Sequence, residues 1–186
     1  SEFGESAETY LKKFMYISVR EGQAQAFLKS QFNLDSESVC DPVILLSRED
    51  WRKLCIPHIN QREKYIFVYL LKPNYELINS VNELVAKEGL KVFVIPGVIN
   101  AASQARHIKN SKIILDAGPR EMLSFIDGAK YIITDSFHGT ALSIILQKQF
   151  AVFVYDGKGN TNSRIENILS VCGLENQKSH KASEVV

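Results

Sequence analysis

The sequence has few cysteines and no long apolar segment, and both absences restrict what the chain can be. The three cysteines, Cys40, Cys55 and Cys172, are widely spaced and form no C-x-x-C pair, so neither a zinc knuckle nor a disulfide framework is indicated. We expect reduced thiols and a cytoplasmic location. Because no apolar run approaches the roughly 20 residues that span a bilayer, we expect neither a transmembrane segment nor a signal peptide.

A surplus of charge of either sign is also lacking. Lysine and arginine number 22 against 21 acidic residues, which gives a formal net charge of +1. Nucleic-acid-binding surfaces are strongly basic, so we expect no nucleic-acid partner, although a local basic cleft for a small anion fits this balance. The glycine patterns G-x-G-x-x-G and G-x-x-x-x-G-K-[ST] are missing, which argues against an ordinary dinucleotide or P-loop site. We predict neither a cofactor nor a metal.

What the chain does contain is a core-forming share of apolar residues, 45% of 186. Residues 1–6, which begin Ser-Glu-Phe-Gly, resemble a remnant of a cloning vector and are set aside. The remainder is divided into residues 7–57, a domain over 58–176 and a polar tail over 177–186. In the first part we expect a strand over Phe14–Arg20 and a helix over Gln23–Phe32.

Residues 58–176 read as alternating strands and helices. Polar or glycine positions mark the helix ends: Asn74, Gly118-Pro119 and Ser163 at starts, Gly89 and Gly173 at stops. The pattern predicts a Rossmann-like α/β fold, a parallel sheet with helices on both faces and strand order 3-2-1-4-5. The stretch Asn100–Asn110 shows no clear pattern. Strands are expected at five apolar segments: Tyr65–Leu71, Val92–Ile95, Ile113–Leu115, Tyr131–Ile133 and Phe150–Val154.

The topology itself nominates a site. Ligands of open parallel sheets bind beyond the carboxyl ends of the strands, where the strand order reverses. For this order the reversal lies between the first and fourth strands. Three loops line it: Lys72–Asn74, the segment after Thr134, and Asp156–Arg164.

The loop after Thr134 has the most unusual contents. Asp135 or Ser136 can cap the following helix, and His138 lies in its first turn, where the helix dipole favours an anion. Gly139 lets a partner approach the backbone, and Thr140 adds a hydroxyl. The alternative is structural: Ser136 only caps, His138 forms an internal hydrogen bond, and Gly139 relieves crowding against the sheet.

The other two loops offer cations. The Asp156–Arg164 loop contains glycine, asparagine and serine together with Lys158 and Arg164, and it can wrap a phosphate or carboxylate, with arginine as a bidentate donor. It can equally be a surface connection, and Lys72 can be a solvated lysine. We include Lys72, Asn162 and Ser163 with Ser136, Gly139 and Thr140 as candidate substrate-binding residues.

The segment Tyr131–Phe150, YIITDSFHGTALSIILQKQF, resembles the signature of the polysaccharide pyruvyl transferases. Gly118-Pro119 agrees, and so do three further segments: Ile17–Glu21, Asp41–Trp51 and Asn162–Leu169. The resemblance runs from about Tyr16 to Leu174. It implies the C-terminal half of a GT-B-like fold, in which two Rossmann-like halves face a cleft. Residues 7–57 would then be the end of the N-terminal half with its linker, and 58–176 the donor-binding domain.

The resemblance also implies a reaction. Members transfer a group from phosphoenolpyruvate to a sugar, as a pyruvate ketal on a surface polysaccharide or on its precursor. The expected partners are therefore phosphoenolpyruvate and a sugar or polysaccharide-precursor acceptor, with contact to a membrane-bound, lipid-linked acceptor. By resemblance His138 binds the donor or acts as the acid catalyst, and Arg164 and Arg20 hold the donor's anionic groups.

Two departures and two alternatives accompany this interpretation. Arg120 and Leu142 stand where the family more often has an acidic and an aromatic residue. The family enzyme is about twice as long, so we expect this chain to be inactive alone. One alternative is a GT-B nucleotide-sugar glycosyltransferase or epimerase relative, with Asp156 or Glu166 at the ribose. The other is a catalytically silent assembly domain, which predicts a buried His138 bonded to the backbone and no open cleft.

Overall fold

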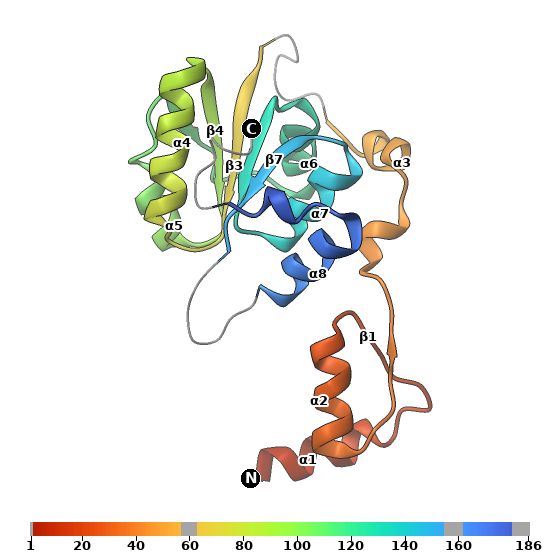
Figure 1. Ribbon diagram of the computed structural model, residues 1–186. Coiled ribbons are helices and arrows are strands. Elements are labelled where there is room, and N and C mark those ends of the chain that lie inside the picture. Colours follow the sequence, from red (N-terminus) through yellow and green to blue (C-terminus); the bar gives the residue numbers. More distant parts are fainter. Residues whose placement is uncertain (1, 57–62, 155–161, 180–186) are drawn as a thin grey trace. The chain divides into compact units, whose positions relative to one another are not determined.

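The computed structural model describes residues 2–56, 63–154 and 162–179, and only the backbone of 2–6 (Figure 1). The chain divides into two compact units, Ser1–Leu45 and Leu46–Val186. Within the described residues no helix is both long and apolar enough to cross a membrane. The division of the chain at residues 57 and 58, and the assignment of residues 1–6 to a vector, remain predictions.

The first unit is small. It contains α1 (Glu2–Leu11), β1 (Ser18–Val19), α2 (Gly22–Phe32), β2 (Glu37–Ser38) and the 3-10 turn η1 (Pro42–Leu45). The two strands pair in parallel, with Ser18 opposite Glu37. The predicted helix is present, but the strand predicted over Phe14–Arg20 is reduced to two residues. Its partner is only two residues long, and the side chains of Met15 and Tyr16 are 91% and 90% exposed, so no packing extends the strand.

The second unit is built on a five-stranded sheet. Its strands are β3 (Tyr65–Leu70), β4 (Lys91–Pro96), β5 (Ser111–Ile113), β6 (Tyr131–Thr134) and β7 (Gln149–Val152). All neighbours are parallel, in the order β5-β4-β3-β6-β7. The predicted order 3-2-1-4-5 is therefore confirmed. The central strand β3 is almost wholly buried, as its continuous apolar run predicts.

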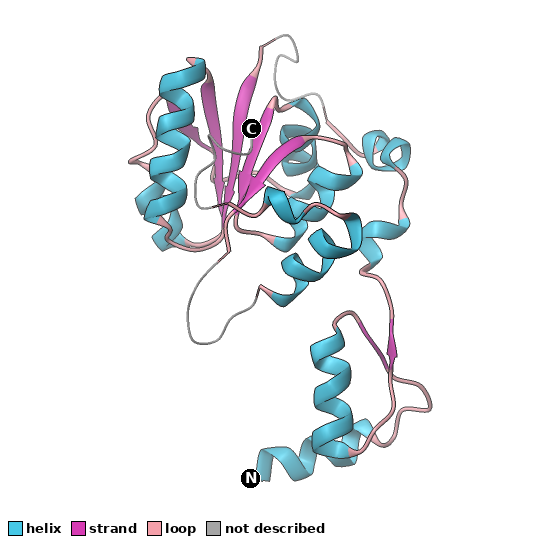
Figure 2. Cartoon of the chain, viewed as in Figure 1, coloured by secondary structure: helices cyan, strands magenta, loops and turns pink. Residues whose placement is uncertain are grey.

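Helices cover both faces of this sheet (Figure 2). Figure 1 shows α4 (Tyr75–Glu88) and α5 (Ile99–Ala105) on one side, and α6 (Pro119–Gly128) and α7 (Phe137–Ile145) on the other. Alternate strand residues fill the two cores: Ile66 and Val68 belong to the first, whereas Phe67 stacks on Phe125 of α6 with ring centroids 5.7 Å apart. The remaining elements are α3 (Arg48–Lys53), α8 (Ser163–Cys172) and η2 (Glu175–Gln177).

Capping residues set most helix ends as predicted. The Asn74 side chain accepts a hydrogen bond from the Leu77 amide at 3.0 Å, and Gly89 ends α4 with φ at 68°. Pro119 occupies the first turn of α6. The Ser163 prediction is wrong by one residue: Ser163 is the first helical residue of α8, and Asn162 is at the N-cap without a side-chain capping bond.

The third strand lies earlier than predicted. It spans Ser111–Ile113, with Ile113 opposite Val94, whereas the prediction was Ile113–Leu115. Asn110 takes a left-handed φ of 51° immediately before it, and this turn delivers Ser111 to the edge of the sheet. Leu115 is consequently 76% exposed beyond the end of the strand. The unassigned stretch Asn100–Asn110 contains most of α5.

The helix α3 is held within the second unit by polar contacts to α6. Arg52 Nε lies 2.9 Å from Asp127 Oδ1, and the Ile56 amide donates to Ser124 Oγ at 2.6 Å. Arg120 Nε donates to the Leu54 carbonyl oxygen at 2.9 Å. Arg120 therefore serves this junction, where an acidic side chain could not donate.

Candidate functional site

Asp135 joins the two loops at the point where the strand order reverses. It follows β6, and its carboxylate accepts hydrogen bonds from the amides of Leu71 at 2.7 Å and Lys72 at 2.9 Å, in the loop after β3. Burial raises the pKa of Asp135, although these backbone hydrogen bonds oppose the rise. The sequence offered either Asp135 or Ser136 as the helix cap. The structure gives that role to Ser136 and makes Asp135 a bridge between loops.

A cavity of about 60 Å³ lies beside this bridge. Two of the predicted substrate-binding residues, Lys72 and Asn162, line it, and they come from different nominated loops. The described residues thus place the three nominated loops around one small pocket, although Asp156 and Lys158 lie outside the described part of the chain. The lining consists of Leu71, Lys72, Pro73, Asn74, Asp135, Phe153 and Asn162.

The inward side of the first turn of α7 is occupied by structural contacts. Ser136 Oγ accepts from the Gly139 amide at 3.4 Å, and Thr140 Oγ1 donates to the Ser136 carbonyl oxygen at 2.8 Å. Thr134 Oγ1 donates to the Tyr69 carbonyl at 2.8 Å and accepts from the Ser136 amide at 3.0 Å. Ser136, Gly139 and Thr140 are all buried, so they hold the turn on the sheet.

Gly139 is required by a close approach of Thr134. A Cβ added at Gly139 would lie 2.6 Å from Thr134 Oγ1 and 3.1 Å from its Cγ2. Real Cβ atoms do not tolerate such separations, so glycine permits α7 to pack directly on β6. The group that approaches the backbone here is therefore a side chain of the sheet.

The outward side of the same turn presents ionisable groups. His138 is exposed, and its ring meets the edge of Phe137 with centroids 5.3 Å apart. The Arg164 guanidinium, from the first turn of α8, lies 4.9 Å from the centroid of the same Phe137 ring. Phe137 is buried and shared by both groups. A histidine and an arginine far apart in sequence therefore flank one aromatic ring at the amino end of α7.

This arrangement suits a small anion. The amino end of a helix carries a partial positive charge, and its first-turn amides lack helical acceptors. Two of these four amides already have acceptors: the Ser136 amide donates to Thr134 Oγ1 and the Gly139 amide to Ser136 Oγ. The other two amides are those of Phe137 and His138. An exposed histidine does not match the buried His138 that a silent assembly domain predicts.

A comparison with protein families decides the relationship. The model for polysaccharide pyruvyl transferases matches residues 2–157, most of the chain. The chain belongs to the polysaccharide pyruvyl transferase family. Among curated proteins, no sequence matches it.

Solved structures place this pyruvyl transferase family member in a known fold. UDP-GlcNAc 2-epimerase from Neisseria meningitidis is similar with a TM-score of 0.55 and 12% identity, over 90% of this chain and 56% of that one. The enzyme from Methanocaldococcus jannaschii gives 0.54 and 16%, over 89% and 55%. At such low identity the likeness shows the fold alone. The chain spans about half the length of these relatives, and its sheet is the C-terminal half of a GT-B-like fold.

Within this family member, Arg20 belongs to the other compact unit. Its guanidinium pairs with the buried Asp41 carboxylate, whose second oxygen accepts from the Val43 amide at 3.0 Å. A donor-binding role for Arg20 remains a prediction. Ser163 is half-buried at the start of α8.

Sequence reasoning missed Phe137, which joins His138 to Arg164. It also missed the position of Thr134 under the turn. The available signal was the large aromatic Phe137 between Ser136 and His138, because arginine guanidinium groups often lie over aromatic rings.

Proposed function

We propose that this chain carries the donor-binding domain of a transferase that takes phosphoenolpyruvate and forms a pyruvate ketal on a sugar. The acceptor would be a sugar of a surface polysaccharide or of its precursor, including a lipid-linked one. Family membership gives the class of enzyme. The observation that carries the specific proposal is the pair His138 and Arg164 around Phe137 at the amino end of α7.

The chemistry of phosphoenolpyruvate matches this pair. The donor has a phosphate and a carboxylate, and a guanidinium binds either of them with two hydrogen bonds. The helix end favours the second anion. Imidazole is the side chain best suited to donate a proton near neutral pH. We therefore assign Arg164 to donor binding and His138 to acid catalysis.

The reaction balances with these groups and needs no oxidant or reductant. His138 donates a proton to the methylene carbon of the donor, or to the departing phosphate. Two hydroxyl oxygens of the sugar form bonds to the central carbon, and the bond from that carbon to the phosphate oxygen breaks. The hydroxyls lose two protons, while the new methyl group and the released phosphate each gain one. Lys72, beside Asp135 at the neighbouring pocket, would attract the anionic donor.

The second candidate is a nucleotide-sugar enzyme. The observation in its favour is the fold shared with the two epimerases, both of them solved with bound UDP-GlcNAc. Glu166, exposed in the first turn of α8, would then face a ribose. At 12% identity the likeness gives the fold and no substrate, so phosphoenolpyruvate, which family membership suggests, is the first choice.

Calorimetric titration separates the two candidates. Phosphoenolpyruvate and UDP-GlcNAc are titrated into the wild type, His138→Ala and the matched control His107→Ala, which removes another exposed histidine. We expect phosphoenolpyruvate to bind the wild type and the control, and His138→Ala to lose at least about tenfold in affinity, or about 1.4 kcal/mol.

Preference for UDP-GlcNAc would favour the second candidate. Equal binding of phosphoenolpyruvate by His138→Ala and the wild type, or no binding by either, would contradict the proposal.

A further inference from the structure

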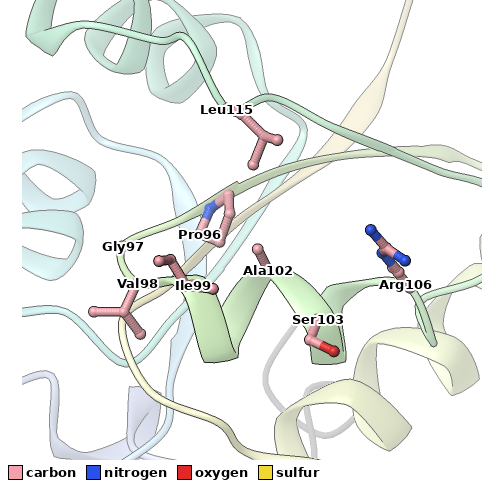
Figure 3. A pocket seen from close by; sticks show the side chains of 8 residues that line it. All are labelled: Pro96, Gly97, Val98, Ile99, Ala102, Ser103, Arg106 and Leu115. Carbon is pink, nitrogen blue, oxygen red and sulfur yellow. The ribbon is translucent and has the colours of Figure 1, made fainter.

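A second and larger cavity opens beyond the carboxyl ends of β4 and β5 (Figure 3). Its volume is about 530 Å³, within the usual range of small-molecule pockets. It shares no lining residue with the pocket beside Asp135. The lining consists of Pro96, Gly97, Val98, Ile99, Ala102, Ser103, Arg106 and Leu115.

The walls of this cavity are mostly apolar and exposed. Val98 is 50% exposed, Ile99 89% and Leu115 76%. They come from the loop after β4, the start of α5 and the segment after β5, and Figure 3 shows Leu115 across the cavity from α5. Large apolar side chains gathered around a hollow are typical of a binding site, whereas single exposed ones are ordinary.

The floor of the cavity is fixed by close packing. The Gly97 amide donates to the Leu70 carbonyl oxygen at 2.8 Å. A Cβ at Gly97 would lie 2.5 Å from Leu71 Cδ2 and 3.3 Å from its Cα, so the backbone here rests directly on the loop after β3. The cavity is therefore part of the fold and lies next to the loop after β3.

A single cation stands at one end of the cavity. Arg106 is the C-cap residue of α5, and Ser103, three residues earlier in the chain, also lines the cavity (Figure 3). Within the described part of the chain, Arg106 has neither an ion pair nor a hydrogen bond through its guanidinium. The other described arginines each engage a protein group: Arg20 with Asp41, Arg48 with Gln147, Arg52 with Asp127, Arg120 with Leu54 and Arg164 with Phe137.

We propose that this cavity binds an anionic amphiphile, an apolar chain bearing one phosphate or carboxylate. The chain would lie against Val98, Ile99 and Leu115, and the head group would bind Arg106 with help from the Ser103 hydroxyl. A free sugar needs more polar partners than these walls offer, and a small, highly charged anion would leave the walls unused. This site does not rest on the proposed function.

Farnesyl phosphate, below its aggregation concentration, is the probe. Farnesol lacks the head group and inorganic phosphate lacks the chain, so the three ligands separate the two contributions. The variants are Arg106→Ala and Ile99→Asp. The matched controls are Lys109→Ala, which removes a nearby exposed cation, and Val171→Asp, which places the same charge on an exposed apolar position of α8. Affinities are measured by calorimetry, with circular dichroism to check folding.

We expect farnesyl phosphate to bind about tenfold more tightly than farnesol, which is the effect of a single charge-assisted contact. Arg106→Ala should abolish that difference, Ile99→Asp should weaken both ligands at least tenfold, and the two controls should behave as the wild type. Equal affinity for farnesyl phosphate and farnesol, equally tight binding of inorganic phosphate, or insensitivity to Ile99→Asp would each overturn the proposal.

Discussion

The two sides of the first turn of α7 differ in what their residues do. On the inward side Ser136, Gly139 and Thr140 are buried and bound to one another and to Thr134 of β6. On the outward side His138 is exposed beside Phe137 and Arg164. A residue in this motif can therefore matter for folding or for the ligand. Changes on the inward side should therefore lower the stability of the fold, whereas changes on the outward side should lower the affinity for phosphoenolpyruvate.

The largest loss of stability is expected for Gly139→Ala. The new Cβ would overlap Thr134 Oγ1, and overpacking of a tight contact costs about 2–3 kcal/mol. Urea denaturation followed by circular dichroism measures the change. Gly118→Ala is the control in the same unit, because its Cβ would meet only the carboxylate end of Glu121, a flexible side chain. An equally stable Gly139→Ala would show that α7 does not rest on β6 as described.

Thr134→Val should come next, with a loss of about 2 kcal/mol. The substitution keeps the shape but leaves the Ser136 amide without its acceptor, and it removes the hydroxyl donor of the Tyr69 carbonyl, which is paired opposite Thr134 in the sheet. Thr140→Val is the matched control, with an expected loss of about 1 kcal/mol, because the Ser136 carbonyl that Thr140 Oγ1 contacts also accepts the helical bond of the Thr140 amide. Unfolding curves that rank the two variants in the opposite order would break the comparison.

Ser136→Ala should have a smaller effect, about 0.5–1 kcal/mol, because it removes one long capping bond of 3.4 Å. Thermal unfolding of the variant beside Ser47→Ala, the equivalent change at the cap of α3, tests this value. A loss above that of Thr134→Val would mean that the Ser136 hydroxyl has a further partner.

Asp135→Asn tests the bridge through its pH dependence. Because burial raises the native pKa of Asp135 above the ordinary 3.8, the native state keeps this proton to higher pH than the unfolded chain. The stability that the group contributes is fully present below pH 3.8 and is lost as pH rises through the native pKa. The unfolding free energy of the wild type minus that of Asp135→Asn should therefore fall with rising pH. Urea titrations between about pH 3.5 and 7 measure it, and a rising difference contradicts the assigned burial.

The sequence predicts the sheet well because its strands are buried on both faces. The run Tyr65–Leu71 has no alternative to a central strand, and short connections with right-handed crossovers leave few strand orders. The edge strand was misplaced by two residues because Ile113–Leu115 is wholly apolar, whereas the actual strand Ser111–Ile113 contains a serine and a lysine. Only its pairing with β4 identifies it as the strand.

The candidate site could be located from the sequence but not resolved. The topology gave the loops, and His138 followed from the contents of the loop after Thr134 and from the resemblance. Which of Asp135 and Ser136 caps α7 depends on the amides of Leu71 and Lys72, about 64 residues away in the chain, and no local rule contains them. Likewise, the close approach of Thr134 to Gly139 exists only once α7 has packed on β6, and the contact of Arg164 with Phe137 exists only once α8 lies beside α7.

The most direct test of the outward side measures two quantities on one variant. For His138→Ala we predict an unfolding free energy equal to that of the wild type, because the side chain is exposed, together with the loss of phosphoenolpyruvate binding in the calorimeter. Arg164→Lys, which keeps the charge but not the bidentate geometry, should bind with intermediate affinity. A His138→Ala protein that is destabilised yet binds phosphoenolpyruvate as tightly as the wild type would show that His138 belongs to the fold and not to the site.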